Sequence, residues 1–202
     1  MRVLIAATAL AAATAAAAPA AATVTITVSA RDNSSTGGTP LATGLTFVAG
    51  QRFRITSSLN DLWSAGDLPR FSDANGLVGN RFKTAADDAA PNGGGSYAIG
   101  TLIGESFGNY SQGNLTAPFG SLVAFIAPGQ WQLLGANGTF TSQGGPLNLA
   151  YFDSNNGDNF GEITFTITAV PEAATWAMMI VGLGIVGGSL RVRRRSAAAL
   201  TA

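Results

Sequence analysis

The 202-residue sequence contains no cysteine and no histidine. Without cysteine there is no disulfide scaffold and no thiolate nucleophile, and without either residue type a zinc site built on them is excluded. Hydrolases that depend on a histidine base are excluded for the same reason. Asp and Asn are plentiful, so chemistry based on hard cations with oxygen ligands stays open.

Charged residues are scarce, at 11% of the chain, and the formal net charge is zero. Five arginines and Glu172 lie in the terminal segments, which leaves six basic and ten acidic residues in the body, positions 23–170. The body is therefore mildly acidic, and nucleic acid is not expected as a partner. The 26 glycines, with abundant Asn, Ser and Thr, are typical of a secreted β-rich protein with many turns.

The first residues have the pattern of a secretory signal peptide. Arg2 supplies a positive start, Val3 to Ala18 form an apolar run, and Ala20-Ala21-Ala22 gives an A-x-A cleavage pattern. We therefore predict a signal peptide over residues 1–22, removed by signal peptidase during export, with cleavage after Ala20 as a close alternative. An alanine-rich helix of the mature protein is the other interpretation, but such a helix would have no polar face.

The other end of the chain predicts a single membrane helix. Residues 173–190 contain no charged side chain and are followed by a basic tail at 191–195. Eighteen helical residues reach about 27 Å, near the lower limit for a bilayer span. The arginines would stay on the cytoplasmic side, which places the body outside. The alternative, a buried core helix, is disfavoured by the arginine cluster that follows it.

The C-terminal segment resembles the PEP-CTERM sorting signal. It begins with Pro171 and Glu172, continues through Trp176 and a glycine-rich apolar run, and ends in Arg193, Arg194 and Arg195. Ala173 stands where many such signals have a second proline. The resemblance implies processing by an exosortase near the Pro-Glu pair, in a Gram-negative host that makes exopolysaccharide. The expected location is the cell surface, the outer membrane or the extracellular matrix, with at least transient contact with the inner membrane.

The body is predicted to be all-β. Residues 23–29 and 162–168 alternate between apolar and polar side chains, which is the pattern of half-buried strands. Weaker strand candidates lie at 45–49, 52–57, 97–103, 122–126, 131–134 and 147–152, while 58–96 is irregular. These runs and the turn residues between them predict one extracellular β-sandwich domain over 23–170, with seven or eight strands. We expect the first and last strands to be neighbours.

A cluster of Asp and Asn between the last two predicted strands is a candidate calcium site. Asp153, Asn155, Asp158 and Asn159 supply four side-chain oxygens, which are the ligands that Ca²⁺ prefers. The spacing is not that of an EF-hand loop, because Asp158 and Thr164 stand where that loop has Gly and Glu. Asn, Asp and Gly are also what tight turns require, so a hairpin loop without a metal is the alternative.

The order of short motifs in the body resembles the calcium-dependent galactophilic lectin domain of bacteria, a small β-sandwich. The resemblance rests on these motifs, in chain order: Trp63-Ser-Ala-Gly66, Asp73-Ala-Asn75-Gly76, Gly100 to Gly104, Phe119, Leu147 to Tyr151, Asp153 and Asp158-Asn159-Phe-Gly161. It implies Asp153, Asp158 and Asn159 as side-chain calcium ligands, with backbone carbonyls near Gly66 and Asn156. It also implies that sugar hydroxyls complete the coordination.

The sugar contacts of that lectin family do not all have counterparts in this chain. The family's sugar-binding histidine is missing, so galactose specificity is not expected. Asp73 and Asn75 are the candidates for that side of the site, together with Asp153. Trp63 is a candidate platform for a pyranose ring, although a tryptophan in a β-sandwich is more often part of the core.

Three functions are compatible with these patterns. The first is a non-enzymatic carbohydrate-binding module, assisted by calcium and associated with extracellular polysaccharide in a biofilm matrix. The second is a structural matrix or surface protein without a ligand. The third is an exported glycoside hydrolase with Glu105 and Asp153 as its acid pair, but nothing in the sequence sets their separation, and we expect no enzyme activity.

Overall fold

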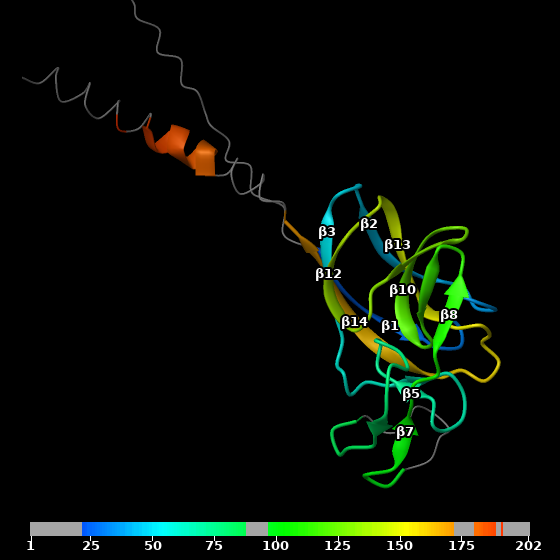
Figure 1. Cartoon of the computed structure of the whole chain (residues 1–202). Helices are drawn as coiled ribbons and strands as arrows, with labels where there is room; N and C mark the ends of the chain where they lie inside the picture. Colours follow the sequence, from blue (N-terminus) through cyan, green and yellow to red (C-terminus); the bar gives the residue numbers. More distant parts are fainter. Residues whose placement is uncertain (1–21, 88–96, 172–179, 189–190, 192–202) are drawn as a thin grey trace, which may run out of the picture. The chain divides into compact units, whose positions relative to one another are not determined.

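The computed structural model describes residues 22–87, 97–171, 180–188 and 191 (Figure 1). Ala21–Val170 cluster as one compact unit, and the residues from Pro171 onward belong to a second unit. The first unit consists of β-strands and loops. The all-β class predicted for the body is therefore confirmed. The predicted signal peptide lies outside the described residues.

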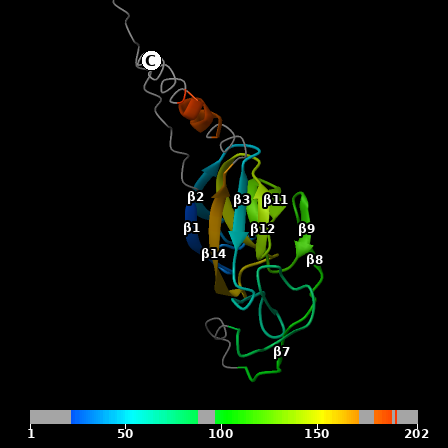
Figure 2. The same cartoon turned by 90° about the vertical axis from the view of Figure 1, so that its left-hand side faces the viewer.

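The larger of the two main sheets is built around the last strand, β14 (Phe160–Val170). Strand β1 (Thr23–Ser29) runs antiparallel along one edge of β14. The other edge pairs with β3 (Arg52–Thr56) and, further toward the start of β14, with the short β4 (Trp63–Ser64). Strands β12 (Asn137–Thr141) and β5 (Phe71–Ser72) complete this sheet of six strands. Figure 2 shows β1, β14, β3 and β12 side by side.

The second main sheet has four strands in the order β11-β10-β13-β2. These strands are β11 (Gln130–Leu133), β10 (Ser121–Ala127), β13 (Gly145–Phe152) and β2 (Leu41–Phe47). Two smaller sheets of two strands each pair β6 (Arg81–Phe82) with β7 (Leu102–Gly104), and β8 (Asn109–Gln112) with β9 (Leu115–Pro118).

One hydrophobic cluster joins the two main sheets. The six-stranded sheet contributes side chains such as Phe53, Ile163 and Phe165 to this cluster. The four-stranded sheet contributes side chains such as Leu122 and Leu149. All five are buried. The two sheets are therefore packed against each other across a shared core, and this burial is the main source of stability for a domain without disulfides.

The alternating pattern at the two ends of the body explains why β1 and β14 form. In β14 the apolar Ile163, Phe165 and Ile167 are all fully buried, whereas the residues between them are not. Strand β1 pairs with β14 from Thr23↔Thr168 to Ser29↔Glu162. The prediction that the first and last strands are neighbours is therefore confirmed.

Several weaker expectations differ from the structure. The main sheets contain six and four strands, more than the seven or eight expected in total. The strand expected at 45–49 begins earlier, at Leu41, because Leu41 pairs with Leu149 in β13. Of the strand expected at 97–103, only the last two residues form a strand, as part of β7 (Leu102–Gly104). The segment expected to be irregular contains β4, β5 and β6, each of two residues, which is too short for a periodic pattern.

Candidate functional site

The segment from Asp153 to Asn159 connects the two main sheets. It leaves the four-stranded sheet at the end of β13 and enters the six-stranded sheet at the start of β14. Because β13 and β14 belong to different sheets, this segment is not the turn of a hairpin, which was the simpler expectation. We call it the connecting loop (residues 153–159).

A second segment, between β1 and β2, holds the connecting loop in place. Ser35 Oγ donates to the Asp153 carbonyl at 3.1 Å and accepts from the Asp153 N–H at 3.2 Å. Asn156 Nδ2 donates to the carbonyls of Gly37 and Arg31, at 3.0 and 3.3 Å. The Arg31 guanidinium donates in return to the Asn156 carbonyl and to the next residue's carbonyl. The geometry of the connecting loop is therefore fixed by contacts that the sequence did not reveal.

Asp153 is a buried carboxylate in this loop. It is only 3% exposed, and its Oδ1 accepts a 2.6 Å hydrogen bond from the Ser154 N–H. Burial raises the pKa of Asp153, and the negative charge of Asp158 raises it further, while hydrogen bonds from Ser154 and Asn159 act in the opposite direction. Among the described residues, no ion pair includes Asp153.

Asn159, in the same loop, has a buried side-chain oxygen without a hydrogen-bond partner among the described residues. Its Nδ2 donates to the carbonyls of Asn155 and Ala30, at 2.9 and 3.3 Å, which fixes the orientation of the amide. Its Oδ1 is buried and accepts no hydrogen bond from any described residue. An unsatisfied buried acceptor costs about 1–3 kcal/mol. The Asn159 side chain also donates a hydrogen bond to Asp153, which lowers the pKa of this acid. Within the described part of the chain, the connecting loop therefore contains a buried carboxylate without an ion-pair partner and a buried amide oxygen without a hydrogen-bond donor.

Asp158 forms the open side of the cluster. Its side chain is 51% exposed, and its Oδ2 lies 3.8 Å from Arg70 Nη1. A Cβ atom built on Gly66 would lie 2.9 Å from the same Oδ2, so the backbone of Gly66 passes directly beside this carboxylate. Gly66 has φ +128°, which side-chain-bearing residues rarely adopt. Glycine is therefore required where the two segments approach.

The donor set fits a hard divalent cation. Asp153 and Asp158 supply carboxylate oxygens, and Asn159 supplies the unsatisfied amide oxygen, all of which suit Ca²⁺. The other predicted ligands fit less well, because the Asn156 carbonyl accepts from Arg31 and the Gly66 carbonyl accepts from Ser64 Oγ. Among the described residues, no three Asp, Glu, His or Cys side chains cluster as a metal site. The side-chain ligands that the connecting loop can supply to a cation are therefore two carboxylates and one amide oxygen.

Of the residues predicted for sugar binding, Asp153 belongs to this cluster, whereas Asp73 and Asn75 make their contacts elsewhere. Asp73 Oδ1 accepts from the Asn75 N–H at 2.8 Å, and Asn75 Oδ1 accepts from the Ala136 N–H at 3.1 Å. Ser121 bridges to Asn75 on one side and pairs with Phe152 on the other, so β10 separates Asn75 from the start of the connecting loop. The Asp73 side chain thus stabilises its own loop, and the Asn75 side chain ties that loop to the segment before β12. Both residues border a separate hollow of about 200 Å³.

Trp63 is a core residue. Its ring is fully buried, contacts Tyr151 edge-on with centroids 4.7 Å apart, and its Nε1 donates to the Gly120 carbonyl at 2.9 Å. Because no face of the ring reaches solvent, the predicted role as a platform for a sugar is wrong. The physical reason is that the Trp63 side chain points into the core between the two main sheets, where it packs on Tyr151 of β13 and Phe165 of β14.

A second buried acid has a structural role in the long segment after β3. The Asp87 carboxylate is buried, accepts from the Thr84 N–H at 2.7 Å and pairs with Arg81 Nη2 at 2.5 Å. Burial on its own would raise the pKa of Asp87, but these two donors outweigh burial and lower the pKa. Arg81 also pairs with Asp73 at 3.4 Å. Asp87 has an ion-pair partner, whereas Asp153 has none among the described residues.

The C-terminal residues match a known protein family. Residues 169–195 match the family described as the PEP-CTERM protein-sorting motif. This chain carries a PEP-CTERM sorting motif. The motif implies an exported protein that is processed by an exosortase, in agreement with a cell-surface or extracellular location. No curated protein matches the chain, and the resemblance of the body to the lectin domain stays a prediction.

The PEP-CTERM segment is described in part. Pro171 is exposed, and residues 180–188 are helical with mostly exposed side chains. Glu172, Trp176, Arg193, Arg194 and Arg195 lie outside the described residues, as does much of the membrane helix predicted at 173–190. Within the described part of the chain, no helix has both the length and the apolar character needed to cross a bilayer.

Proposed function

We propose that the body of this exported, exosortase-processed protein is a non-enzymatic, calcium-dependent carbohydrate-binding module of the cell surface or extracellular matrix. Asp153, Asp158 and Asn159 hold the calcium ion. The observation that carries the proposal is a pair of buried groups in the connecting loop: the Asp153 carboxylate, and the Asn159 side chain, whose Oδ1 has no hydrogen-bond donor among the described residues. A divalent cation satisfies both groups at once, and no described basic side chain is paired with Asp153.

The arrangement of the three ligands suits an ion that also binds a sugar. Asp153 and Asn159 are buried and fixed by hydrogen bonds, so they hold the ion without a large loss of side-chain entropy. Asp158 is half exposed, which leaves one side of the ion open to solvent. Ca²⁺ takes six to eight oxygen ligands. Adjacent hydroxyl groups of a pyranose can supply those that the protein does not.

The sorting motif supports a polysaccharide as the partner. It addresses the protein to the cell surface or beyond, where exopolysaccharide is the abundant polyol. The chain has no histidine or cysteine, which fits a binding module better than a hydrolase that depends on such a base or nucleophile.

The test is glycan-array binding by the purified full chain in calcium and in EDTA. We expect binding in calcium that EDTA abolishes and that added calcium restores. The Asp158→Ala variant should not bind, whereas the control Glu162→Ala, which removes an exposed acid from β14, should bind normally. Binding that survives EDTA, or an absence of binding to any glycan and to host exopolysaccharide by a folded chain, contradicts the proposal.

The second candidate is a structural surface protein without a ligand. The observation in its favour is that Asn156 and Ser35 tie the connecting loop to the segment before β2 by direct hydrogen bonds, so the loop needs no ion to keep its shape. Under this alternative Asp158→Ala changes neither the melting temperature nor the response to calcium.

A further inference from the structure

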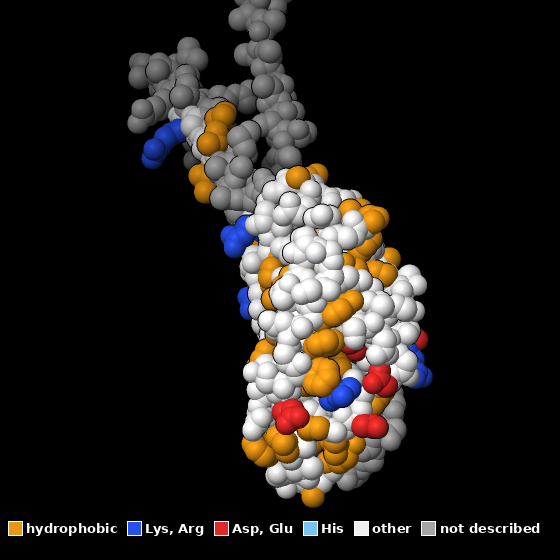
Figure 3. All heavy atoms as spheres, turned by 45° about the vertical axis from the view of Figure 1, so that its right-hand side comes forward, with side chains coloured by type: hydrophobic (Ala, Val, Ile, Leu, Met, Phe, Trp, Pro, Cys, Tyr) orange, Lys and Arg blue, Asp and Glu red, His pale blue; other side chains and the backbone are white. Residues whose placement is uncertain are grey.

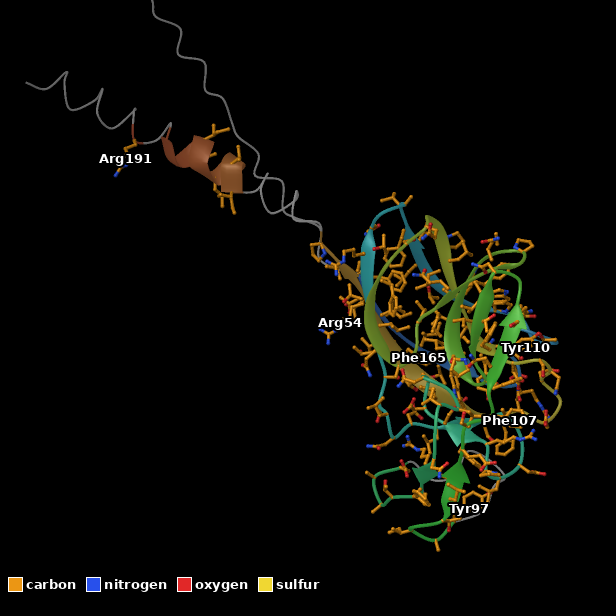
Figure 4. All side chains as sticks on the ribbon, viewed as in Figure 1. Arg54, Tyr97, Phe107, Tyr110, Phe165 and Arg191 are labelled. Carbon is orange, nitrogen blue, oxygen red and sulfur yellow. The ribbon has the colours of Figure 1, made fainter. Side chains whose placement is uncertain are left out.

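A row of aromatic rings lies beside the connecting loop. Phe107 contacts Phe119 with centroids 5.2 Å apart, Phe119 stacks on Tyr110 at 5.5 Å, and Tyr110 contacts Phe152 at 5.1 Å. Tyr110 Oη is hydrogen bonded to Thr36 Oγ1 at 3.2 Å, so the row lies next to the segment that holds the connecting loop. Figure 4 shows Phe107 and Tyr110 on the same side of the body. Phe107 is the most open of these rings, at 43% exposed.

Arg70 joins this aromatic row to the acidic cluster. Its guanidinium carbon lies 4.2 Å from the centre of the Phe107 ring, and its Nη1 lies 3.8 Å from Asp158 Oδ2. The Arg70 side chain is 37% exposed. A guanidinium stacked on an aromatic ring is oriented by it and keeps donors available for a carboxylate. Figure 3 shows hydrophobic side chains running down the side of the body that carries β8, with acidic and basic side chains beside them.

The charge of this cluster changes sign when calcium binds. Asp153 and Asp158 are two negative groups and Arg70 is one positive group, so the cluster has a net charge of −1 without metal when both acids are ionised. A bound Ca²⁺ changes the net charge to +1. The site with calcium therefore attracts an anionic ligand, and the site without calcium repels one.

We propose that this surface selects an acidic glycan: the carboxylate of a uronic acid residue pairs with Arg70, and the apolar face of its pyranose ring packs on Phe107. The proposal rests on the calcium-dependent glycan binding proposed above and adds the ligand class and the residues that select it. Asp158, which lies 3.8 Å from Arg70 Nη1, would be a ligand of a bound calcium ion, and the Arg70 guanidinium would then be available to donate to the carboxylate of the glycan. A planar guanidinium binds a carboxylate through two parallel hydrogen bonds, which a neutral sugar does not match.

The experiment compares two disaccharides that differ in one carboxylate. The full chain is titrated calorimetrically with calcium alone, and then, at saturating calcium, with cellobiouronic acid and with cellobiose. We expect the acid to bind more tightly than the neutral sugar, and only when calcium is present. Charge-assisted hydrogen bonds contribute enough that Arg70→Gln should weaken binding of the acid by about tenfold or more, with calcium binding intact.

Two matched controls separate a local effect from a general one. Arg54→Gln removes the same charge from β3, on the opposite side of the body from Phe107 (Figure 4), and should leave binding of the acid unchanged. Phe107→Ala should weaken binding of the acid, whereas Phe82→Ala, which removes another exposed ring on β6, should not.

The outcomes distinguish this inference from the function on which it rests. A calorimetric titration with calcium that shows no heat of binding overturns the proposed function. Normal calcium binding with equal affinity for the two sugars, or with no measurable affinity for the acid, overturns the inference alone. The same conclusion follows if Arg70→Gln and Arg54→Gln weaken binding of the acid equally.

Discussion

The substitution Asp153→Asn should have opposite effects on stability in EDTA and in calcium. Without metal, the folded-state pKa of Asp153 is raised by burial, so the ionised carboxylate destabilises the folded protein at pH values above that pKa. Asparagine removes this buried charge and its Oδ1 can still accept the hydrogen bond from Ser154. At pH 8 in EDTA, the melting temperature of the variant should therefore equal or exceed that of the wild type.

In calcium the order should reverse. A ligand present at 100 times its Kd stabilises the folded state by about 2.7 kcal/mol. For a domain of about 150 residues each kcal/mol shifts the melting temperature by about 2–4 °C, so the wild type should gain about 5–11 °C. The variant lacks a charged ligand, so it should gain little under the same conditions.

Thermal melting followed by tryptophan fluorescence at pH 8, in EDTA and in calcium, measures both effects. Glu162→Gln is the matched control, because it removes one acid from an exposed position on β14 and should keep the calcium response. A variant that is destabilised equally in both buffers would refute the reasoning, since Asp153 would then act only through its hydrogen bonds.

Three further predictions concern stability in EDTA, measured by urea unfolding. The folded protein binds the Asp153 proton more tightly than the unfolded chain does. This acid should therefore make the free energy of unfolding decrease as pH rises from its usual pKa of 3.8 to its raised pKa in the folded protein. The substitution Asp153→Asn should remove this decrease. Asp87 has a lowered pKa, so its contribution is present above pH 3.8 and is lost as pH falls through the folded value; at pH 7, Asp87→Asn should cost about 1–3 kcal/mol. Phe165→Ala, in the fully buried centre of β14, should cost about 3–5 kcal/mol.

Each of these three has a result that contradicts it. Identical pH profiles for the wild type and Asp153→Asn would show that the pKa of this acid is not raised by folding. An unchanged urea midpoint for Asp87→Asn would mean that the pair with Arg81 adds nothing. A cost below about 1 kcal/mol for Phe165→Ala would place this ring outside a packed core.

The sequence predicted those parts of the fold that depend on local periodicity. Residues 23–29 and 162–168 alternate strictly, and both are strands that pair with each other. Two-residue strands such as β4 and β5 have no periodicity to detect. Their existence depends on pairing with β14 and with each other, which is information distributed over the whole chain.

The candidate site was predictable in its acids but not in its surroundings. Asp153, Asp158 and Asn159 are close in sequence, so their proximity follows from a short loop. The contacts that hold the loop come from Ser35 and Arg31, which lie more than a hundred residues earlier. No pattern within either segment indicates the other.

The residues proposed to select an acidic glycan were missed for the same reason. Arg70 and Phe107 lie in different loops and meet only in the folded protein. Trp63 was a candidate sugar platform with the core as the more frequent alternative, and the structure places it in the core between the two main sheets. In both cases tertiary packing decides what is exposed, and composition does not contain that information.

A calorimetric calcium titration of the purified full chain tests the central claim most directly, with Asn159→Ala and Asp158→Ala as variants. We expect one calcium ion per chain for the wild type and no measurable binding for either variant, while Glu162→Gln should bind as the wild type does. A flat wild-type titration at millimolar calcium would contradict the account and would leave the connecting loop as a structural link between the two sheets.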